Sequence, residues 1–555
     1  MVTSNSIPRV PSFDGSTFYR PNVQSFTYEH KFKQYIEKKF NVQLDTYHDL
    51  HKWSCDNYAD FWESVLLFAD VKLGSNYTEV VDKSKQISDI PQWFRGATLN
   101  YTENCLRGKD EDVAFISASV NRELVFHTYA KLRSDITRLA TALREFGVVS
   151  GDVACGFLPN SYETSVAMFA VAAIGATWAS ASVDFGPSGV LDRFRQVKPK
   201  ILFTVEAVTY KGKRFDLKEK LDRIVSGLPT IQKVVQFNNL NSVIDFSLYE
   251  HGEKYESMET FLNSVKAVPT PFVFEQVPFS HPLFIMFSSG TTGVPKAMVH
   301  TVGAVIGSIS GGTDIIGCFV GCSLSLPVYP GECQCLYLGM NIKAFDANGH
   351  AVEDRQGELV CLTPFPSMPS HFLGDVAHAR YRKAYFERFE GVWAHGDYCE
   401  IRSATGGVVM LGRSDATLNR GGVRIGTAEI YSIVESFSEI DDSVVAGQLV
   451  PDFDDEHILL FVRMAADYTL TETLRRRICT QIRTMMSPRH VPNAIHVVKD
   501  IPLSIPVSLI VTLEDLFILG SEATIEQFDC LNNSFLSAEL CVFVSLFLAC
   551  HRDQL

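Results

Sequence analysis

The first half of the chain alternates between short apolar runs and longer segments with helical periodicity. Between residues 134 and 147, apolar residues recur at spacings of three and four, which predicts an amphipathic helix. Ser134 or Asp135 can cap the start of this helix, and Gly147 can end it.

The next segments complete an α/β pattern. The runs DVACGFLP (152–159) and KILFTV (200–205) indicate buried strands, and residues 162–174 between them indicate an apolar helix. Strands that alternate with helices predict a parallel sheet. The expected fold class is therefore α/β, with a large N-terminal domain of parallel and mixed sheets flanked by helices and a small α+β C-terminal domain.

The pattern changes near LGRSDATL (411–418). Beyond it, HILLFVRMA (457–465) is strand-like and ETLRRRICTQIRTMM (472–486) is helix-like, which predicts a small separate domain with a hinge near Asp415. The expected division is an N-terminal segment at 1–100, a large domain at 101–414, a small mobile domain at 415–504 and an atypical tail at 505–555.

Composition supports an enzyme of ordinary globular type. At 555 residues the chain is too long for one core, and its 46% hydrophobic and 21% charged residues are typical of folded proteins. A net charge of -14 argues against nucleic acid as a partner. The start lacks a secretory pattern, and the longest apolar run, 541–550, is about half of what a bilayer requires. We therefore expect a cytosolic protein with no membrane span and with mostly reduced cysteines.

The stretch SSGTTGVPK (288–296) follows the apolar run PLFIMF, which indicates a buried strand. Glycines allow close backbone approach, and hydroxyls, backbone N–H groups and a lysine can hold phosphate oxygens. The candidate residues are Ser288, Ser289, Gly290, Thr291, Thr292, Gly293 and Lys296. The stretch is not a Walker motif, since no G-K-[ST] opens a helix. The alternative is an ordinary Ser/Thr/Gly turn.

Further motifs favour the phosphate site. In order, SSGTTGVPKAMVH, GGTDI, AHGDY and GRSDATLNRGGVRIGTAEI resemble the acyl-adenylate-forming superfamily of acyl-CoA synthetases, luciferases and peptide-synthetase adenylation domains. YHDLHKWSCDNYADFWESV and WFRGATLNYTEN are similar to its acetyl-CoA synthetase branch. GGTDI, VDFGPSGVLDRF and YRKAYFERFEGVWAHGDYCEI resemble the acetoacetyl-CoA synthetases of that branch.

The resemblance implies a two-step ligase that uses ATP, Mg²⁺ and coenzyme A. Acetoacetate and ATP first give an acyl-adenylate and pyrophosphate; the small domain then rotates, and the thiol of coenzyme A takes the acyl group. By this resemblance, residues 288–296 hold the β- and γ-phosphates, and Lys296 offsets charge on the leaving pyrophosphate. Thr313 contacts the α-phosphate. Asp314 stands where the family usually has a Glu that directs Mg²⁺; its alternative role is a helix N-cap.

The same resemblance assigns the remaining site residues. Asp397 accepts hydrogen bonds from both ribose hydroxyls, and Arg413 adds a ribose or phosphate contact. Asp415 is the pivot of the small domain, and Arg424 reaches the α-phosphate. The alternatives are a turn aspartate for Asp397 and surface ion pairs for the two arginines. Weaker candidates are Gly421, Gly422 and Arg483 for coenzyme A, and Trp178 for the acyl pocket, with turn, solvated helix face and core as their respective alternatives.

Two departures from the family pattern qualify this assignment. Only 16 residues separate Lys296 from Thr313, whereas the family has several βα units there, each of roughly thirty residues or more. We expect a large domain without this block, with uncovered apolar faces and unpaired strand edges near 301–312.

The second departure is the end of the chain. Beyond Ile501 there is no lysine, and Arg552 is the sole arginine, whereas the family carries a lysine there that contacts the carboxylate and the α-phosphate. Loss of such a charge removes several powers of ten in rate, which predicts crippled adenylation. Two hypotheses stay open: an acetoacetate–CoA ligase, and a non-catalytic splice or gene-model variant that retains at most nucleotide or partner binding.

Overall fold

The structure, a computed structural model, describes residues 28–498 with several gaps. The gaps are 118–123, 211–212, 241–243, 289–294, 304–313, 324, 415–416, 421–422 and 450–455. The short junction after β15 and the tail at 505–555, to which the two departures belong, thus lie outside the described residues.

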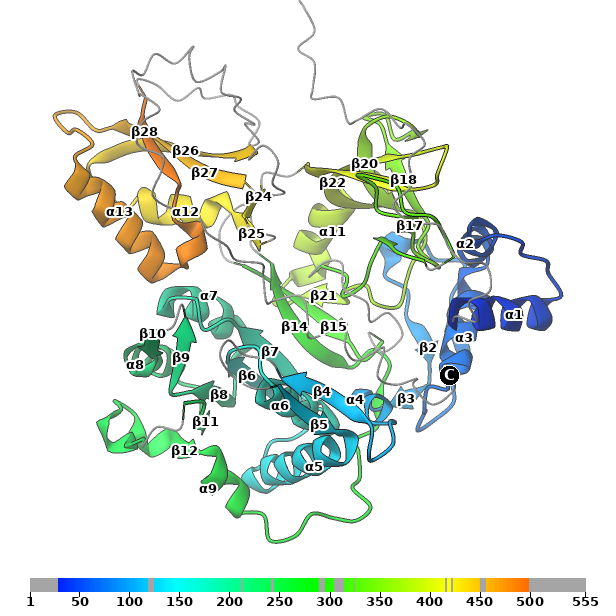
Figure 1. Cartoon of the computed structure of the whole chain (residues 1–555), viewed down its shortest axis with the longest axis horizontal. Helices are drawn as coiled ribbons and strands as arrows, with labels where there is room; N and C mark the ends of the chain where they lie inside the picture. Colours follow the sequence, from blue (N-terminus) through cyan, green and yellow to red (C-terminus); the bar gives the residue numbers. More distant parts are fainter. Residues whose placement is uncertain are drawn as a thin grey trace, which may run out of the picture.

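An eight-stranded sheet forms the centre of the large domain, in the order β12–β11–β8–β6–β7–β14–β15–β21 (Figure 1). Its strands are β6 (Val153–Phe157), β7 (Thr177–Ala181), β8 (Ile201–Val205), β11 (Lys233–Phe237), β12 (Tyr255–Ser257), β14 (Pro282–Ser288), β15 (Lys296–Thr301) and β21 (His371–Phe372). The six strands from β12 to β14 pair in parallel, and the last two pairs are antiparallel. The predicted parallel sheet is confirmed, with an antiparallel edge.

Helices flank this sheet. They are α5 (Tyr129–Phe146), α6 (Tyr162–Ala173), α7 (Pro187–Val197), α8 (Lys218–Ser226) and α9 (Met258–Asn263). Helix α5 ends as predicted at Gly147, which takes φ 96°, but its predicted start is wrong. The Thr128 side chain accepts a hydrogen bond from the backbone N–H of Lys131 and caps the helix several residues before Ser134. Tyr129 and Leu132, both buried, continue the apolar spacing of the helix toward its start, and the prediction did not extend to them.

The edge of the sheet beside the short junction is paired. β21 lies alongside β15, with Met298 opposite Phe372 and Val299 opposite His371. The expected unpaired edge is therefore wrong at β15, because a strand from much later in the chain covers it. Residues 314–316 form a turn rather than the continuation of a strand.

A second, antiparallel sheet has the order β19–β18–β20–β22–β23. Its strands are β18 (Ile342–Phe345), β19 (Ala351–Val352), β20 (Gly357–Cys361), β22 (Trp393–Ile401) and β23 (Val408–Arg413), with α11 (Ala379–Tyr385) before β22. The shorter strands elsewhere are β1 (Glu79–Val81), β2 (Trp93–Arg95), β3 (Thr98–Leu99), β4 (Val113–Ser117), β5 (Val125–Thr128), β9 (Ala207–Tyr210), β10 (Lys213–Asp216), β13 (Val277–Pro278), β16 (Val320–Gly321) and β17 (Cys335–Leu336). The AHGDY motif thus lies within a central strand of this sheet.

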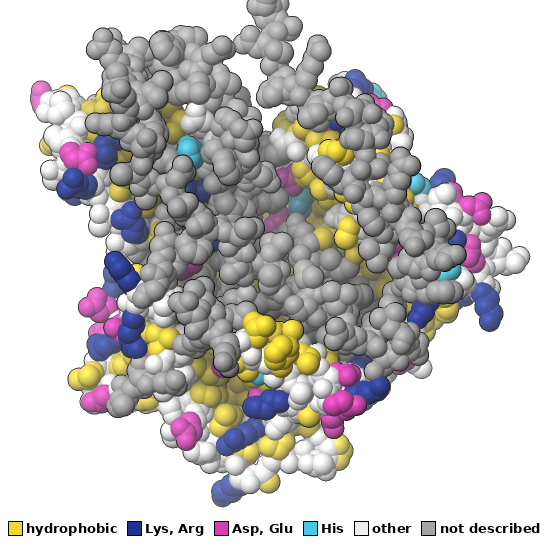
Figure 2. Space-filling view, in the orientation of Figure 1, with side chains coloured by type: hydrophobic (Ala, Val, Ile, Leu, Met, Phe, Trp, Pro, Cys, Tyr) yellow, Lys and Arg dark blue, Asp and Glu magenta, His cyan; other side chains and the backbone are white. Residues whose placement is uncertain are grey.

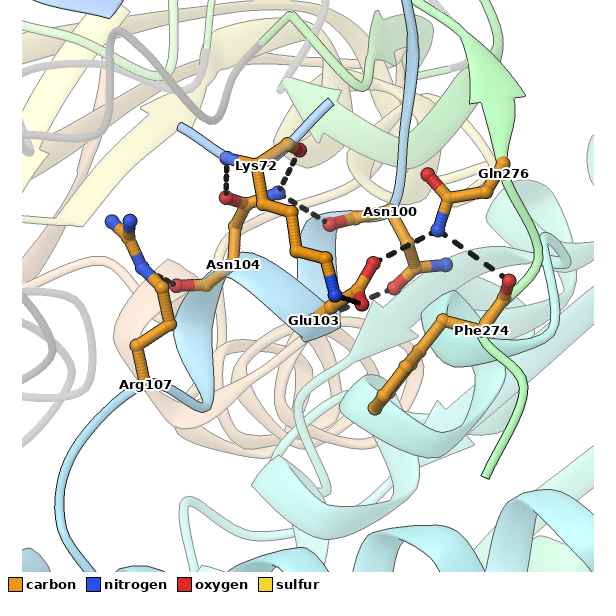
Figure 3. Close-up of polar contacts among 7 residues, drawn as sticks. All are labelled: Lys72, Asn100, Glu103, Asn104, Arg107, Phe274 and Gln276. Atoms are coloured by element: carbon orange, nitrogen blue, oxygen red, sulfur yellow. Dashed lines mark hydrogen bonds and ion pairs between the residues drawn. The ribbon is translucent and has the colours of Figure 1, made fainter. Parts of the chain in front are cut away.

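The N-terminal helices pack onto the same core. They are α1 (Tyr28–Phe40), α2 (Tyr47–Asp56), α3 (Tyr58–Phe68) and α4 (Tyr101–Cys105). Asn100 caps α4, and its side-chain amide donates to the carbonyls of Ala172 at 3.0 Å and Glu275 at 2.9 Å. Around it, Glu103 accepts from Lys72 and Gln276, as Figure 3 shows. This polar network, with Asn100 buried and the contacts of Glu103 at the surface, joins the N-terminal segment to the large domain.

The small domain has a hydrophobic core of its own. It contains β24 (Thr417–Arg420), β25 (Val423–Gly426), α12 (Thr427–Val434), β26 (Ile440–Leu449), β27 (Glu456–Met464), α13 (Glu472–Met485) and β28 (Ala494–Val497). Its cluster of buried residues, from Leu418 to Ile495, is separate from the cluster of the large domain, which extends to Val408. The strand predicted at 457–465 and the helix predicted at 472–486 are confirmed as β27 and α13.

The surface carries mixed charge. On the face shown in Figure 2, Lys and Arg side chains lie among Asp and Glu side chains around the periphery rather than in separate areas. None of the described helices combines the length and apolar character that a bilayer crossing requires.

Candidate active site

The phosphate-loop candidates lie where two neighbouring strands meet. Ser288 ends β14 and Lys296 begins β15, and the two residues are opposite one another in the antiparallel register. The candidates of the loop between them lie outside the described residues: Ser289, Gly290, Thr291, Thr292 and Gly293. Four other candidates also lie outside: Thr313, Asp415, Gly421 and Gly422. Arg413 and Arg424 are described only as backbone positions of β23 and β25.

A cavity of about 250 Å³ opens beside Lys296. Its lining brings together distant parts of the sequence, including Lys296, Asp314, Glu358, Tyr385, His395 and Ser414. Two predicted site residues, Lys296 and Asp314, therefore share one cavity with residues of the AHGDY and LGRSD motifs. A larger cavity, of about 560 Å³, lies elsewhere, between α2 and the turn after β22, and holds none of the predicted site residues.

Along β22, three side chains at alternate positions lie on one face of the strand. The indole N–H of Trp393 donates to Nδ1 of His395 at 3.3 Å, so the proton of the neutral imidazole lies on Nε2. That nitrogen is 3.6 Å from Oδ2 of Asp397. Asp397 is only 4% exposed, and its strand register places it opposite Arg413. The aspartate and the arginine assigned to the ribose are thus neighbours across two strands.

Glu358 in β20 organises the same region. Its carboxylate accepts hydrogen bonds from the backbone N–H of Gly396 at 3.0 Å and from the hydroxyl of Ser414 at 2.8 Å, and it pairs with Arg388. Burial raises the pKa of Glu358, and these three donors only partly oppose the rise. One buried carboxylate therefore ties the residue before Asp397 to Ser414, the residue before the predicted hinge.

Sequence reasoning missed Glu358 and His395. Glu358 lies within the apolar run GELVC, where a single acidic residue carries no periodic signal. His395 was part of the quoted AHGDY motif, but its neighbours across the cavity come from segments far away in the sequence. The presence of an acidic residue inside an otherwise buried strand was the only available hint.

Lys296 and Asp314 fit a site for a phosphate-bound metal. Nζ of Lys296 lies 5.8 Å from the ring centroid of Phe372. Asp314 is half-buried, and together with burial its charge raises the pKa of the neighbouring Tyr381 hydroxyl. Among the described residues, no group of three or more His, Cys, Asp and Glu side chains is placed to hold a metal. A lone carboxylate suits Mg²⁺, which binds through one or two carboxylates, substrate phosphates and water.

Two weaker candidates lie away from this cavity. Trp178 is buried in β7 against Gly156 and 6.0 Å from the ring of Phe203, which is the core position that its alternative interpretation expected. Arg483 is exposed on α13. Neither residue lines the 250 Å³ cavity.

Comparisons with known proteins define the class first. The family model described as AMP-binding enzyme matches residues 102–366, and the model described as Acetyl-coenzyme A synthetase N-terminus matches residues 47–105. The fold is similar to the solved Acetoacetyl-CoA Synthetase from Streptomyces lividans, with a TM-score of 0.67 and 30% identity over 88% of this chain and 92% of that chain. The chain is thus an AMP-binding enzyme of the acetyl-CoA synthetase type.

Closer relatives define the family. The chain is 44% identical to an acetoacetyl-CoA synthetase of Caenorhabditis elegans, over 87% of this chain and 88% of the relative. It is 37% identical to that of Macaca fascicularis, over 88% and 91%. The chain belongs to the acetoacetyl-CoA synthetase family.

The length of these alignments bears on the short junction. The alignment with the Caenorhabditis elegans relative extends over 613 positions, more than the 555 residues of this chain, although it uses only 87% of them. The relative therefore carries residues that have no counterpart here. The expectation that these residues fall between Lys296 and Thr313 stays a prediction.

Proposed function

We propose that the protein activates acetoacetate with ATP through an acyl-adenylate and transfers the acyl group to coenzyme A. The products are acetoacetyl-CoA, AMP and pyrophosphate. The observation that carries this proposal is the identity of 44% with an acetoacetyl-CoA synthetase over most of both chains. The cavity that joins Lys296, Asp314 and the AHGDY strand supports it.

The residues have complementary tasks in the adenylation step. A carboxylate is a poor acyl donor until its leaving group is AMP. Lys296 and Ser288, which flank the glycine-rich loop, offset the charge that accumulates on pyrophosphate. Asp397, a buried acceptor with two oxygens, holds the vicinal diol of ribose. Asp314 holds Mg²⁺, which neutralises phosphate charge when bound.

The other assignments are kept as proposals on the family pattern. Ser289, Thr291 and Thr292 contact the β- and γ-phosphates, Thr313 and Arg424 the α-phosphate, and Arg413 the ribose. Gly421, Gly422 and Arg483 are proposed for coenzyme A, and Asp415 as the pivot.

The state of the cysteines is the basis for the proposed cellular compartment. We place the protein in the cytosol, because all cysteines among the described residues are free thiols, as reducing compartments favour.

An exchange assay tests the function. Purified chain, ATP, Mg²⁺ and labelled pyrophosphate are incubated with acetoacetate or acetate, and label in ATP is followed; acetoacetyl-CoA formation is measured separately. The identity with acetoacetyl-CoA synthetases favours the ligase over the crippled adenylation expected from the lysine-free tail, so we expect exchange that depends on acetoacetate and is abolished in Lys296→Met. If a folded, ATP-binding chain gives no exchange, the non-catalytic alternative from the short junction and the lysine-free tail is favoured instead.

A further inference from the structure

A buried ionic cluster joins the large and small domains. Helix α7 of the large domain faces α12 and α13 of the small domain (Figure 1). The short 3₁₀ helix η5 (Pro488–His490) follows α13 and contacts it. Across this boundary, Oε1 of Glu429 lies 3.3 Å from Nη2 of Arg193, and Oε2 of Glu429 lies 2.7 Å from Nε2 of His490. The three side chains are exposed by only 7%, 5% and 5%, in the order Arg193, Glu429, His490.

Each member of the cluster is held by its own domain. The guanidinium of Arg193 lies 4.2 Å from the ring centroid of Phe185 and donates to the carbonyl of Gly189 at 2.8 Å, both within the large domain. His490 Nδ1 is 2.9 Å from the hydroxyl of Ser487 in the small domain. Arg193 therefore stays with the large domain, and Glu429 and His490 stay with the small one, when the domains move relative to one another.

The backbone makes the same contact. The N–H of Gly186 donates to the carbonyl of Met486 at 2.8 Å. A Cβ at Gly186 would lie 1.9 Å from the carbonyl oxygen of Thr484, so this close approach requires glycine. The VDFGPSGVLDRF motif thus contains both a glycine and an arginine that meet the small domain.

Separation of this cluster is unfavourable. A buried ion pair gains little over an apolar contact, but removal of one partner leaves a charge without compensation in a place shielded from water. Rotation of the small domain separates Arg193 from Glu429. Glu429 keeps His490, whereas Arg193 loses the carboxylate that it meets across the boundary. Asp192, on the same helix as Arg193, lies close to both groups: it repels the charge of Glu429 and offsets part of the charge of Arg193.

We propose that Arg193, Glu429 and His490 are positioning residues that hold the small domain in one of the two orientations required by the two-step reaction. The inference rests on the proposed function in one respect, that both orientations are used in turnover. The cluster sets the relative population of the two orientations, so its loss changes the two half-reactions unequally. None of the three residues needs to touch a substrate for this effect.

Hydrogen exchange of the full chain without substrate tests the contact independently of catalysis. Exchange is followed in peptides covering 186–197 and 484–490, with 153–157 in β6 as a reporter of folding. We expect Arg193→Met and Glu429→Gln to speed exchange in the first two peptides by about tenfold or more, equivalent to about 1.4 kcal/mol. Arg193→Lys retains the charge and restores part of the protection. Glu472→Gln, on the exposed face of α13, is the matched control and leaves exchange unchanged.

The outcomes separate the contact from the activity. Unchanged protection at 186–197 and 484–490 in both variants, with 153–157 intact, overturns the proposal. If Arg193→Met also loses protection at 153–157, that variant is unfolded, and the result for the isosteric Glu429→Gln tests the proposal instead. In an active chain we further expect the ratio of pyrophosphate exchange to thioester formation to shift by about tenfold in Glu429→Gln; an equal fall in both overturns the positioning role. If the unmutated chain shows neither activity, the proposed function is wrong. Hydrogen exchange still shows whether the three residues hold the two domains together.

Discussion

Replacement of Glu358 by alanine tests how the adenylation site is held. The carboxylate is 1% exposed and accepts from Gly396 N–H, Ser414 Oγ and Arg388. Arg388 is 42% exposed and can turn to water, but the other two donors lose their acceptor. Each such donor without a partner costs about 1–3 kcal/mol, so we expect Glu358→Ala to lose about 2–6 kcal/mol of stability.

Glu358→Gln is the matched variant. Its amide oxygen retains one acceptor and its volume leaves no cavity, so we expect a loss of about 1–2 kcal/mol. Urea unfolding of both variants is followed by tryptophan fluorescence, since Trp393 is buried in the same sheet. Because Gly396 precedes Asp397, the ATP affinity of Glu358→Ala should fall as well. Stability within about 0.5 kcal/mol of the parent would refute the view that this carboxylate anchors the site.

Three further predictions concern the affinity for ATP, the packing of the N-terminal segment on the large domain, and the pH dependence of stability. Asp397→Asn should raise the Kd for ATP about 10- to 100-fold in calorimetry, because a hydrogen bond to a charged group is worth about 1.5–3 kcal/mol; an unchanged Kd would remove Asp397 from the ribose site. Asn100→Ala should lower the free energy of unfolding measured in urea by about 2–5 kcal/mol, since the carbonyls of Ala172 and Glu275 lose their donor; an unchanged free energy of unfolding would contradict this. Burial alone would raise the pKa of Glu429, but His490 and Arg193 outweigh it and lower that pKa, so its stabilisation is present above its ordinary value of about 4.3 and lost as pH falls through the lower folded pKa. Acid unfolding of the parent should therefore be steeper than that of Glu429→Gln, and equal slopes would contradict the linkage.

The sequence predicted helices and strands best where the spacing of apolar residues matched a single helix or strand period. β6, β8, α6, β27 and α13 each occupy nearly the predicted residues, because their apolar spacing repeats without interruption. The start of α5 was missed, since its cap, Thr128, belongs to the end of β5. Local patterning contains no signal for a cap that a preceding strand supplies.

Contacts between distant segments lay beyond sequence patterning. The pairing of β15 with β21 was not predicted, because the second sheet's first strands lie between them in the sequence and β21 is only two residues long. The Arg193–Glu429 pair was hidden for the same reason, although both residues lie in quoted motifs. Burial of an isolated charge depends on which elements pack together, and only the folded structure defines that.

The most direct test of the central claim is acetoacetate-dependent exchange of labelled pyrophosphate into ATP by the purified full chain. We expect exchange with acetoacetate that exceeds exchange with acetate and disappears in Lys296→Met. A folded chain that binds ATP but shows no exchange with either acid, or exchange that survives in Lys296→Met, would contradict it.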